Sequence, residues 1–254
     1  MVIVTGTRRS GTSMWMQILQ AAGLPIIGEA FPAAWRRSIE AANPHGFWES
    51  RLRKGVYFDT NPDPETGAYL HPQDTRRTAV KVFARGLVRT DHAFLDRVLV
   101  TMRPWRTVVA SVEELYRQEE AFLGNVPRRP SLSEPDIWWL ENYDILRDAA
   151  VRRYPIRLVA CENVVARPRE TLEPLLRWLG GGDLEAAIEA VDPTLQRSTG
   201  TDQDWELSEL ADAWYDSVRN TGMVQPELVE RMNQAHADLE TRIEAANSSP
   251  ETQD

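Results

Sequence analysis

The N-terminal end of this chain constrains its fold more than any other segment. Residues 1–5 form an apolar run rich in β-branched side chains, and a glycine-bearing loop separates them from an apolar-periodic segment at 12–22, which Gly23 ends. This order predicts a buried strand, a tight loop and a helix. The chain therefore opens with a strand–loop–helix unit.

Strand-like and helix-like segments alternate after this unit. Buried strands are predicted at 78–84, 97–102 and 156–160. Helices are predicted at 105–120, 136–154, 168–179, 207–218 and 226–246, and 33–42 is compatible with a short one. We expect irregular, site-lining structure at 25–73 and a surface loop or lid at 124–133. The alternation predicts an α/β fold, a three-layer α/β/α sandwich with a mainly parallel central sheet and a helical C-terminal part.

Length and composition favour one domain. A chain of 254 residues with 42% hydrophobic composition can bury one large core, so we expect a single domain at 1–246 and a polar, disordered tail at 247–254. No apolar stretch is long enough for a membrane helix, and the apolar start is too short for a signal peptide. Cys161 is the only cysteine, which excludes an intrachain disulfide and a cysteine-based zinc site. These features fit a cytoplasmic protein.

The charge balance limits the classes of partner. The formal net charge is -9, which argues against nonspecific binding to nucleic acid, although a local basic pocket can still hold a small anion. Only Lys54 and Lys81 are lysines among the 29 basic residues, so a lysine here is a residue of interest. No interface pattern stands out from the core pattern, and the sequence leaves the oligomeric state open.

The loop from Gly6 to Ser13 has the features of a phosphate-binding loop. It follows a strand and opens a helix, so backbone N–H groups converge where the helix dipole is positive. The spacing of Gly6 and Gly11 is that of a Walker A loop, but Thr12 stands where a nucleoside triphosphatase has its lysine. Arg9 can direct a cation at the bound group instead.

Two motifs resemble those of one enzyme family. The run Arg9-Ser10-Gly11-Thr12-Ser13 resembles the phosphosulfate-binding loop of sulfotransferases that use 3′-phosphoadenosine-5′-phosphosulfate (PAPS). Residues 98–111 resemble the family's 3′-phosphate motif, in which a strand ends in an arginine, here Arg103, and a serine, here Ser111, follows eight positions later. Physically, an arginine at a strand end and a hydroxyl on the next helix can converge on one phosphate.

A third stretch, 157–180, resembles the family more loosely, so the resemblance covers residues 1–180. It implies a P-loop-like fold, PAPS as co-substrate and adenosine 3′,5′-bisphosphate as product. It also implies a set of nucleotide-binding residues: Arg8, Arg9, Ser10, Gly11, Thr12, Ser13, Arg103, Ser111 and, by likeness to a downstream arginine of related enzymes, Arg197.

Sulfuryl transfer needs cations at the departing phosphate oxygen and a group that removes the acceptor's proton. By its position in the loop Arg9 is the first candidate cation, and Lys81, which matches a lysine of the family, is the second. Phe83 stands where many relatives carry a histidine base. Residues 43–49 resemble an element of bacterial-type sulfotransferases, which makes Glu49 the candidate base and His45 its alternative. We expect no metal, since protein cations can replace it.

The predicted function is therefore transfer of a sulfuryl group from PAPS to a hydroxyl or amine of an unidentified small acceptor. Aromatic residues in 25–73 and 124–139 suggest a partly apolar alcohol or phenol, with carbohydrate and lipid acceptors left open. One alternative is a P-loop kinase or nucleotide hydrolase that uses Arg9 and Mg²⁺. Another is a sulfotransferase-like protein that binds the nucleotide without transferring anything, because Phe83 replaces the histidine.

Overall fold

A parallel sheet forms the centre of this computed structural model, which describes residues 1–30, 46, 48–124, 129–193 and 199–248. The order of its five strands is β2-β5-β1-β6-β7, and every neighbouring pair is parallel. The strands are β1 (Val2–Thr5), β2 (Ile26–Ile27), β5 (Ala79–Lys81), β6 (Arg97–Met102) and β7 (Ile156–Ala160). The first strand of the chain thus lies in the middle of the sheet, fully buried.

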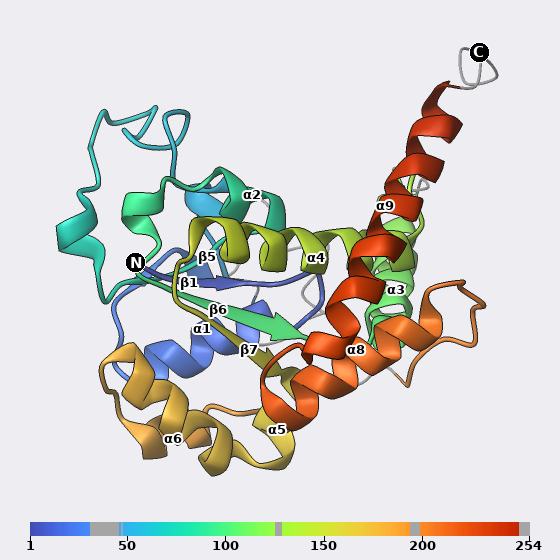
Figure 1. The fold of residues 1–254 in the computed structure, drawn as a ribbon. Coiled ribbons are helices and arrows are strands. Elements are labelled where there is room, and N and C mark those ends of the chain that lie inside the picture. The colour runs from blue at the N-terminus through green and yellow to red at the C-terminus, as the bar shows by residue number, and fades with distance from the viewer. Residues whose placement is uncertain (31–45, 47, 125–128, 194–198, 249–254) are drawn as a thin grey trace.

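Helices cover both faces of the sheet (Figure 1). Successive side chains of a strand point to opposite faces, so Val2 and Val4 of β1 join one core and Ile3 joins the other. The core of Val2 includes residues of α1 (Thr12–Ala21), α5 (Cys161–Ala166), α6 (Pro168–Leu179) and α7 (Leu184–Glu189). The core of Ile3 includes residues of α2 (Ala84–Arg89), α3 (Trp105–Leu123), α4 (Glu134–Arg152), α8 (Ser208–Thr221) and α9 (Pro226–Ser248). The predicted three-layer α/β fold is confirmed.

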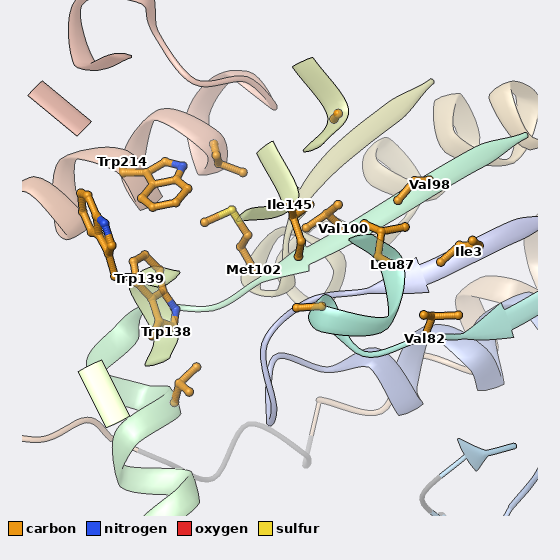
Figure 2. Close-up of a cluster of buried hydrophobic side chains, with 14 of the residues drawn as sticks. Ile3, Val82, Leu87, Val98, Val100, Met102, Trp138, Trp139, Ile145 and Trp214 are labelled. Carbon is orange, nitrogen blue, oxygen red and sulfur yellow. The ribbon is translucent and has the colours of Figure 1, made fainter. Parts of the chain in front are cut away.

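Tryptophan rings join the helical C-terminal part to α4 (Figure 2). The ring of Trp214 in α8 packs edge-on against Trp138 and Trp139 of α4, with centroids 5.4 and 5.3 Å apart. Trp205, just before α8, packs against Trp105 of α3 at 5.0 Å. Such edge-to-face pairs add to the free energy of burying large apolar surfaces. The contacts hold α4 in place, and α4 carries Glu134, which pairs with a residue of the loop after β1.

Most predicted elements are found, with some differences. The strands predicted at 97–102 and 156–160 and the helix at 168–179 have the observed bounds. The strand predicted at 78–84 is too long, because β5 ends at Lys81 and Ala84 begins α2. An apolar run of this length has no periodicity that separates the end of a strand from the first turn of a helix.

Short elements were not predicted. They include β2, the antiparallel pair β3 (Glu29–Ala30) and β4 (Trp48–Glu49), and the helices α2 and α5. The helix predicted at 33–42 and residues 125–128 of the predicted loop lie outside the described residues. The predicted tail overlaps the end of α9, which reaches Ser248, and its residues 249–254 are also outside the described part.

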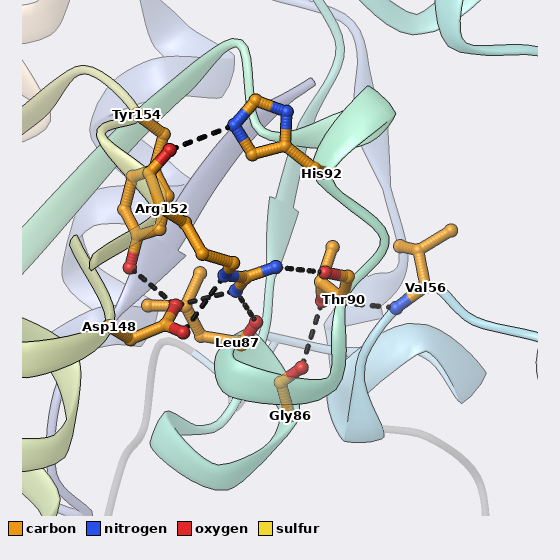
Figure 3. A network of polar contacts seen from close by, with 8 residues as sticks. All are labelled: Val56, Gly86, Leu87, Thr90, His92, Asp148, Arg152 and Tyr154. Atoms are coloured by element: carbon orange, nitrogen blue, oxygen red, sulfur yellow. Dashed lines mark hydrogen bonds and ion pairs between the residues drawn. The ribbon is translucent and has the colours of Figure 1, made fainter.

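A polar network fastens the end of α4 to α2 (Figure 3). The guanidinium of Arg152 donates to the carbonyl oxygens of Leu87 and Thr90, at 2.9 and 2.6 Å, and so satisfies carbonyls at the end of α2. The same guanidinium donates from Nε to Oδ1 of Asp148 at 2.8 Å. Tyr154 donates its hydroxyl to Asp148 as well.

Replacing Arg152 with methionine tests this network. We expect the free energy of unfolding to fall by about 2–4 kcal/mol, because the carboxylate of Asp148 and two carbonyl oxygens lose a charged donor. Urea denaturation measures the change. Arg177→Met is the matched control, since Arg177 pairs with Glu173 on an exposed face of α6, and a change below about 0.5 kcal/mol is expected there. Equal losses in the two variants would contradict a structural role of the network.

Candidate active site

The candidate site lies at the carboxyl ends of β1 and β6. These strands are neighbours, yet the chain leaves β1 toward α1 on one face of the sheet and leaves β6 toward α3 on the other. Where consecutive connections diverge in this way, a crevice opens outside the strand ends, and ligands of α/β proteins bind there. The loop after β1 and the segment Arg103-Pro104 after β6 both lie at this place.

The loop after β1 has a constrained backbone. Gly6 and Gly11 have φ angles of +149° and +100°, and Arg9 between them has φ +65°. A Cβ atom on Gly6 would lie 2.4 Å from the carbonyl oxygen of Thr101 in β6, so only glycine fits this close approach. Left-handed residues within such a loop turn successive N–H groups toward one point, as in anion-binding loops.

Three hydrogen bonds join this loop to β6, to Arg103 just after β6, and to α3. Thr101 donates its hydroxyl to the carbonyl oxygen of Ser10 at 2.9 Å, and Arg103 donates from Nη1 to the carbonyl oxygen of Arg9 at 3.0 Å. Nε of Arg9 donates to the hydroxyl oxygen of Ser111 at 2.9 Å. The two motifs that the sequence singled out are therefore in direct contact.

Positive charge is concentrated at this contact. Burial and, to a smaller extent, the neighbouring charge of Arg103 lower the pKa of Arg9 to about 10. The guanidinium stays protonated at neutral pH, so two cations lie close together in a partly desolvated place. Two cations in such a place attract a bound anion more strongly than the same two cations would in water.

The start of α1 offers further donors. The helix begins at Thr12 without a side-chain cap and without an acidic residue in its first turn. The N–H groups of this first turn can therefore donate to an anion. The hydroxyls of Thr7 and Ser10 are buried and have no hydrogen-bond partner among the described residues. Ser13, by contrast, accepts a hydrogen bond from the backbone N–H of Trp48 at 3.3 Å. The orphaned hydroxyls suit an anionic ligand in the loop.

Lys81 and Glu49 form a buried ion pair. Nζ of Lys81 donates to Oε1 of Glu49 at 2.7 Å, and the two residues are 7% and 4% exposed. Burial lowers the pKa of Lys81, the carboxylate of Glu49 raises it, and the charges of Arg9 and Arg53 lower it. The second oxygen of Glu49, Oε2, is buried without a hydrogen-bond partner in the described part of the chain. A predicted cation, Lys81, and the predicted base, Glu49, are thus brought together near Arg9.

Arg8 points away from Arg9. Its guanidinium forms an ion pair with Glu134 at the start of α4, with Nε 3.0 Å from Oε2, and donates from Nη1 to the hydroxyl oxygen of Tyr116 at 2.8 Å. Tyr116 donates to Oε1 of Glu134 at 3.3 Å. The charge of Arg8 is therefore balanced within the protein, and its role as a nucleotide ligand stays a prediction.

Glu141 of α4 is a partly buried carboxylate near Arg8 that sequence reasoning missed. Burial raises its pKa to about 7, against the lowering effects of the charges of Arg8 and Arg85 and of a hydrogen bond from the Arg8 backbone, while Glu134 raises it. The only sequence signal was helical spacing. Residues at this spacing lie on one stripe along a helix, and in α4 this stripe consists of Glu134, Trp138, Glu141 and Ile145. Trp138 and Ile145 are buried, so the stripe faces the core and Glu141 is a carboxylate within it.

A cavity of about 520 Å³ opens beside Glu49. Arg53, Lys54 and Tyr57 are among the residues that line it, and all belong to the region predicted to shape an acceptor pocket. Phe83, at the position where the resemblance to sulfotransferases led us to expect a histidine, is 41% exposed, and its ring centroid is 5.6 Å from Nζ of Lys81.

Two predicted site residues, His45 and Arg197, lie outside the described residues. Within the ranges that the structure describes, no three His, Cys, Asp or Glu side chains are grouped as metal ligands. A search of the same ranges for a helix of membrane-spanning length and apolarity finds none.

No protein-family model and no curated protein sequence matches this chain. Among solved structures, the chain is similar to the sulfotransferase domain from the curacin biosynthetic pathway, with a TM-score of 0.42, 13% identity and coverage of 93% of this chain and 96% of that one. It is also similar to the sulfotransferase domain from the Synechococcus PCC 7002 olefin synthase, with a TM-score of 0.39, 14% identity and coverage of 93% and 94%. At such low TM-scores and identities, neither likeness establishes a family or an activity for this chain.

Replacing Gly6 with alanine tests the close approach of the loop to β6. We expect the free energy of unfolding to fall by about 3 kcal/mol or more, because the methyl group would both strain the backbone and collide with Thr101. Gly23→Ala is the matched control: its φ is +85°, but a Cβ there meets nothing within 4 Å, so a loss of about 1–2 kcal/mol is expected. Urea denaturation measures the loss of free energy of unfolding in each variant. Equal losses in the two variants would contradict this account.

The pKa of Glu141 predicts a pH-dependent stability. An acid whose pKa is raised from 4.5 to about 7 on folding binds its proton more tightly in the folded state, so its contribution to stability is lost as the pH rises through this interval. Glu141→Gln should therefore stabilise the protein by about 1–3 kcal/mol at pH values above the pKa and by little below both values. Thermal unfolding across this pH range measures it, with the exposed Glu120→Gln as a control that should show no such dependence.

Proposed function

We propose that this protein transfers a sulfuryl group from PAPS to a hydroxyl or amine of a small acceptor and releases adenosine 3′,5′-bisphosphate. One observation carries the proposal: the loop containing Arg9 meets Arg103 and Ser111 at the carboxyl ends of two neighbouring parallel strands. The likeness of both segments to the nucleotide-binding motifs of sulfotransferases supports it.

Thr12 stands where a nucleoside triphosphatase has its phosphate-contacting lysine, which favours PAPS over a nucleoside triphosphate. PAPS carries two anionic groups on one ribose, the 3′-phosphate and the 5′-phosphosulfate. The contacts of Arg9 with Ser111 and of Arg103 with the Arg9 carbonyl bring two cationic groups to one place, as such a ligand needs. In the proposed complex, the loop and Arg9 hold the 5′ side, and Arg103 with Ser111 holds the 3′-phosphate.

The loop suits the 5′ group chemically. The buried hydroxyls of Thr7 and Ser10 can donate to its oxygens, as can the N–H groups at the start of α1. When bound, PAPS supplies an activated sulfonate. Arg9 and Lys81 are the cations that would stabilise the negative charge on the departing phosphate oxygen.

Glu49 has two proposed roles on the acceptor side. Its Oε1 holds Lys81 in place, and its Oε2 is a buried oxygen that could accept a proton. The adjacent cavity lined by Arg53 and Tyr57 is the proposed acceptor pocket. His45, the alternative base predicted from the sequence, stays a prediction.

Isothermal titration with adenosine 3′,5′-bisphosphate in EDTA tests the proposal. We expect tight binding without metal, weakened about 10- to 100-fold in Arg103→Ala, because a charged donor to the phosphate is lost. Arg117→Ala is the matched control: Arg117 lies on an exposed side of α3, the helix that follows Arg103, and is paired with Glu114, so its removal should leave the affinity unchanged.

The same titration, repeated with Mg-ATP and followed by an assay of PAPS breakdown, separates the alternatives. Binding of Mg-ATP, with no binding of the bisphosphate, would replace the proposal with a P-loop kinase or hydrolase. Binding of the bisphosphate without any breakdown of PAPS would indicate a protein that only binds the nucleotide. This outcome is worth testing because Phe83, and not a histidine, lies beside Lys81.

A further inference from the structure

One short segment forms a wall of the cavity beside Glu49. After Glu49 and Ser50 the chain makes the helical turn Arg51–Lys54, and both Glu49 and Arg53 line the cavity. Ser50 fixes the start of this turn, because its hydroxyl oxygen accepts a hydrogen bond from the backbone N–H of Leu52 at 3.1 Å. The candidate base and a cation are therefore held on the same wall by neighbouring residues.

Backbone contacts with α2 and with the end of β5 hold this turn in place. Gly86 of α2 lies so close that a Cβ atom there would be 2.5 Å from the carbonyl carbon of Lys54 and 2.8 Å from the carbonyl oxygen of Arg53. The same oxygen of Arg53 accepts a hydrogen bond from the N–H of Phe83 at 2.8 Å, two residues after Lys81. The backbone of Arg53 is thus joined directly to the segment that carries Lys81.

The charges of the cavity that are shielded from water have a positive sum. Glu49 is buried, but its charge is matched by Lys81 at 2.7 Å. Arg53 is half-buried and adds a positive charge near enough to lower the pKa of Lys81. The exposed charged residues of the lining are two acids and two bases, and water screens them: Glu29, Asp59, Arg51 and Lys54. A ligand group that reaches Arg53 therefore meets a net positive charge.

Glu49 and Arg53 recognise different chemical groups. The buried Oε2 of Glu49 has no hydrogen-bond partner among the described residues, so it can accept from a hydroxyl of a ligand. The planar guanidinium of Arg53 matches the two oxygens of a carboxylate. Tyr57, which is half-buried in the same lining, can pack against the carbon atoms of the ligand. The cavity volume of about 520 Å³ suits a small molecule.

From this arrangement we propose that the acceptor is a small hydroxy acid, whose hydroxyl donates to Oε2 of Glu49 and whose carboxylate binds Arg53. The assignment rests on the proposed function, because it takes the cavity as the acceptor pocket. It narrows the acceptor predicted from the sequence, a partly apolar alcohol or phenol, to one that also carries a negative charge. Neutral carbohydrates and amines do not meet this requirement.

Three phenols of similar shape and different charge test the proposal: 4-hydroxyphenylacetate, 4-hydroxyphenylacetamide and tyramine. Each is titrated into protein saturated with adenosine 3′,5′-bisphosphate, so that the nucleotide site is already filled. We expect the wild type to bind the carboxylate about 10-fold more tightly than the neutral amide, and tyramine most weakly. Arg53→Met should lose this preference with its bisphosphate affinity unchanged, and Arg53→Lys, which keeps the charge, should retain part of it. Arg89→Met serves as the control, since Arg89 is exposed at the end of α2 and does not line the cavity.

The outcomes distinguish the acceptor class from the proposed function. An amide or an amine that binds as tightly as the carboxylate would overturn the hydroxy acid, as would a preference that persists in Arg53→Met. Failure of the carboxylate to bind the saturated wild type would overturn it too. A wild type that binds no bisphosphate would overturn the proposed function, while a carboxylate preference that depends on Arg53 would still stand as a property of the cavity.

Discussion

The close approach of the loop after β1 to β6 is the constraint on which the candidate site depends. Gly6 lies against the Thr101 carbonyl, and the Thr101 hydroxyl holds the carbonyl of Ser10. Since β1 is central and buried, its loop cannot move away without disturbing the sheet. Arg9, Arg103 and Ser111 consequently meet at one point, although they follow different strands. The sheet order, rather than any single residue, creates this meeting point.

Positive charge gathers around this point. The whole chain is acidic, with a formal net charge of -9, yet Arg9, Arg103 and Lys81 lie near one another at the ends of the strands. Lys81 is paired with Glu49 and Arg8 with Glu134. Burial and the like charge of Arg103 lower the pKa of Arg9. Adjacent residues of one loop thus have different roles: Arg8 anchors the loop to α4, and Arg9 contacts Ser111 of α3.

The helical C-terminal part contributes to the site at a distance. Its tryptophan contacts hold α4 against the sheet, and α4 carries both the anchor of Arg8 and the carboxylate of Glu141. Desolvation of Glu141 is a consequence of this packing, because its stripe of α4 continues into the core through Trp138 and Ile145. The free energy of burying aromatic surface therefore offsets the cost of holding a carboxylate there.

Local patterns of the sequence determined the strand–loop–helix start, the strands at 97–102 and 156–160 and the helix at 168–179. These features depend on periodicity and glycine positions, which act between near neighbours in the chain. The grouping of the Arg9 loop with Arg103 and Ser111 as one candidate site came instead from the resemblance of both motifs to those of sulfotransferases. Tertiary structure decided that Lys81 pairs with Glu49, 32 residues away, and Arg8 with Glu134, 126 residues away. It also decided that Glu141 is desolvated, since ion pairing and burial depend on what packs around a side chain and not on its place in a helix.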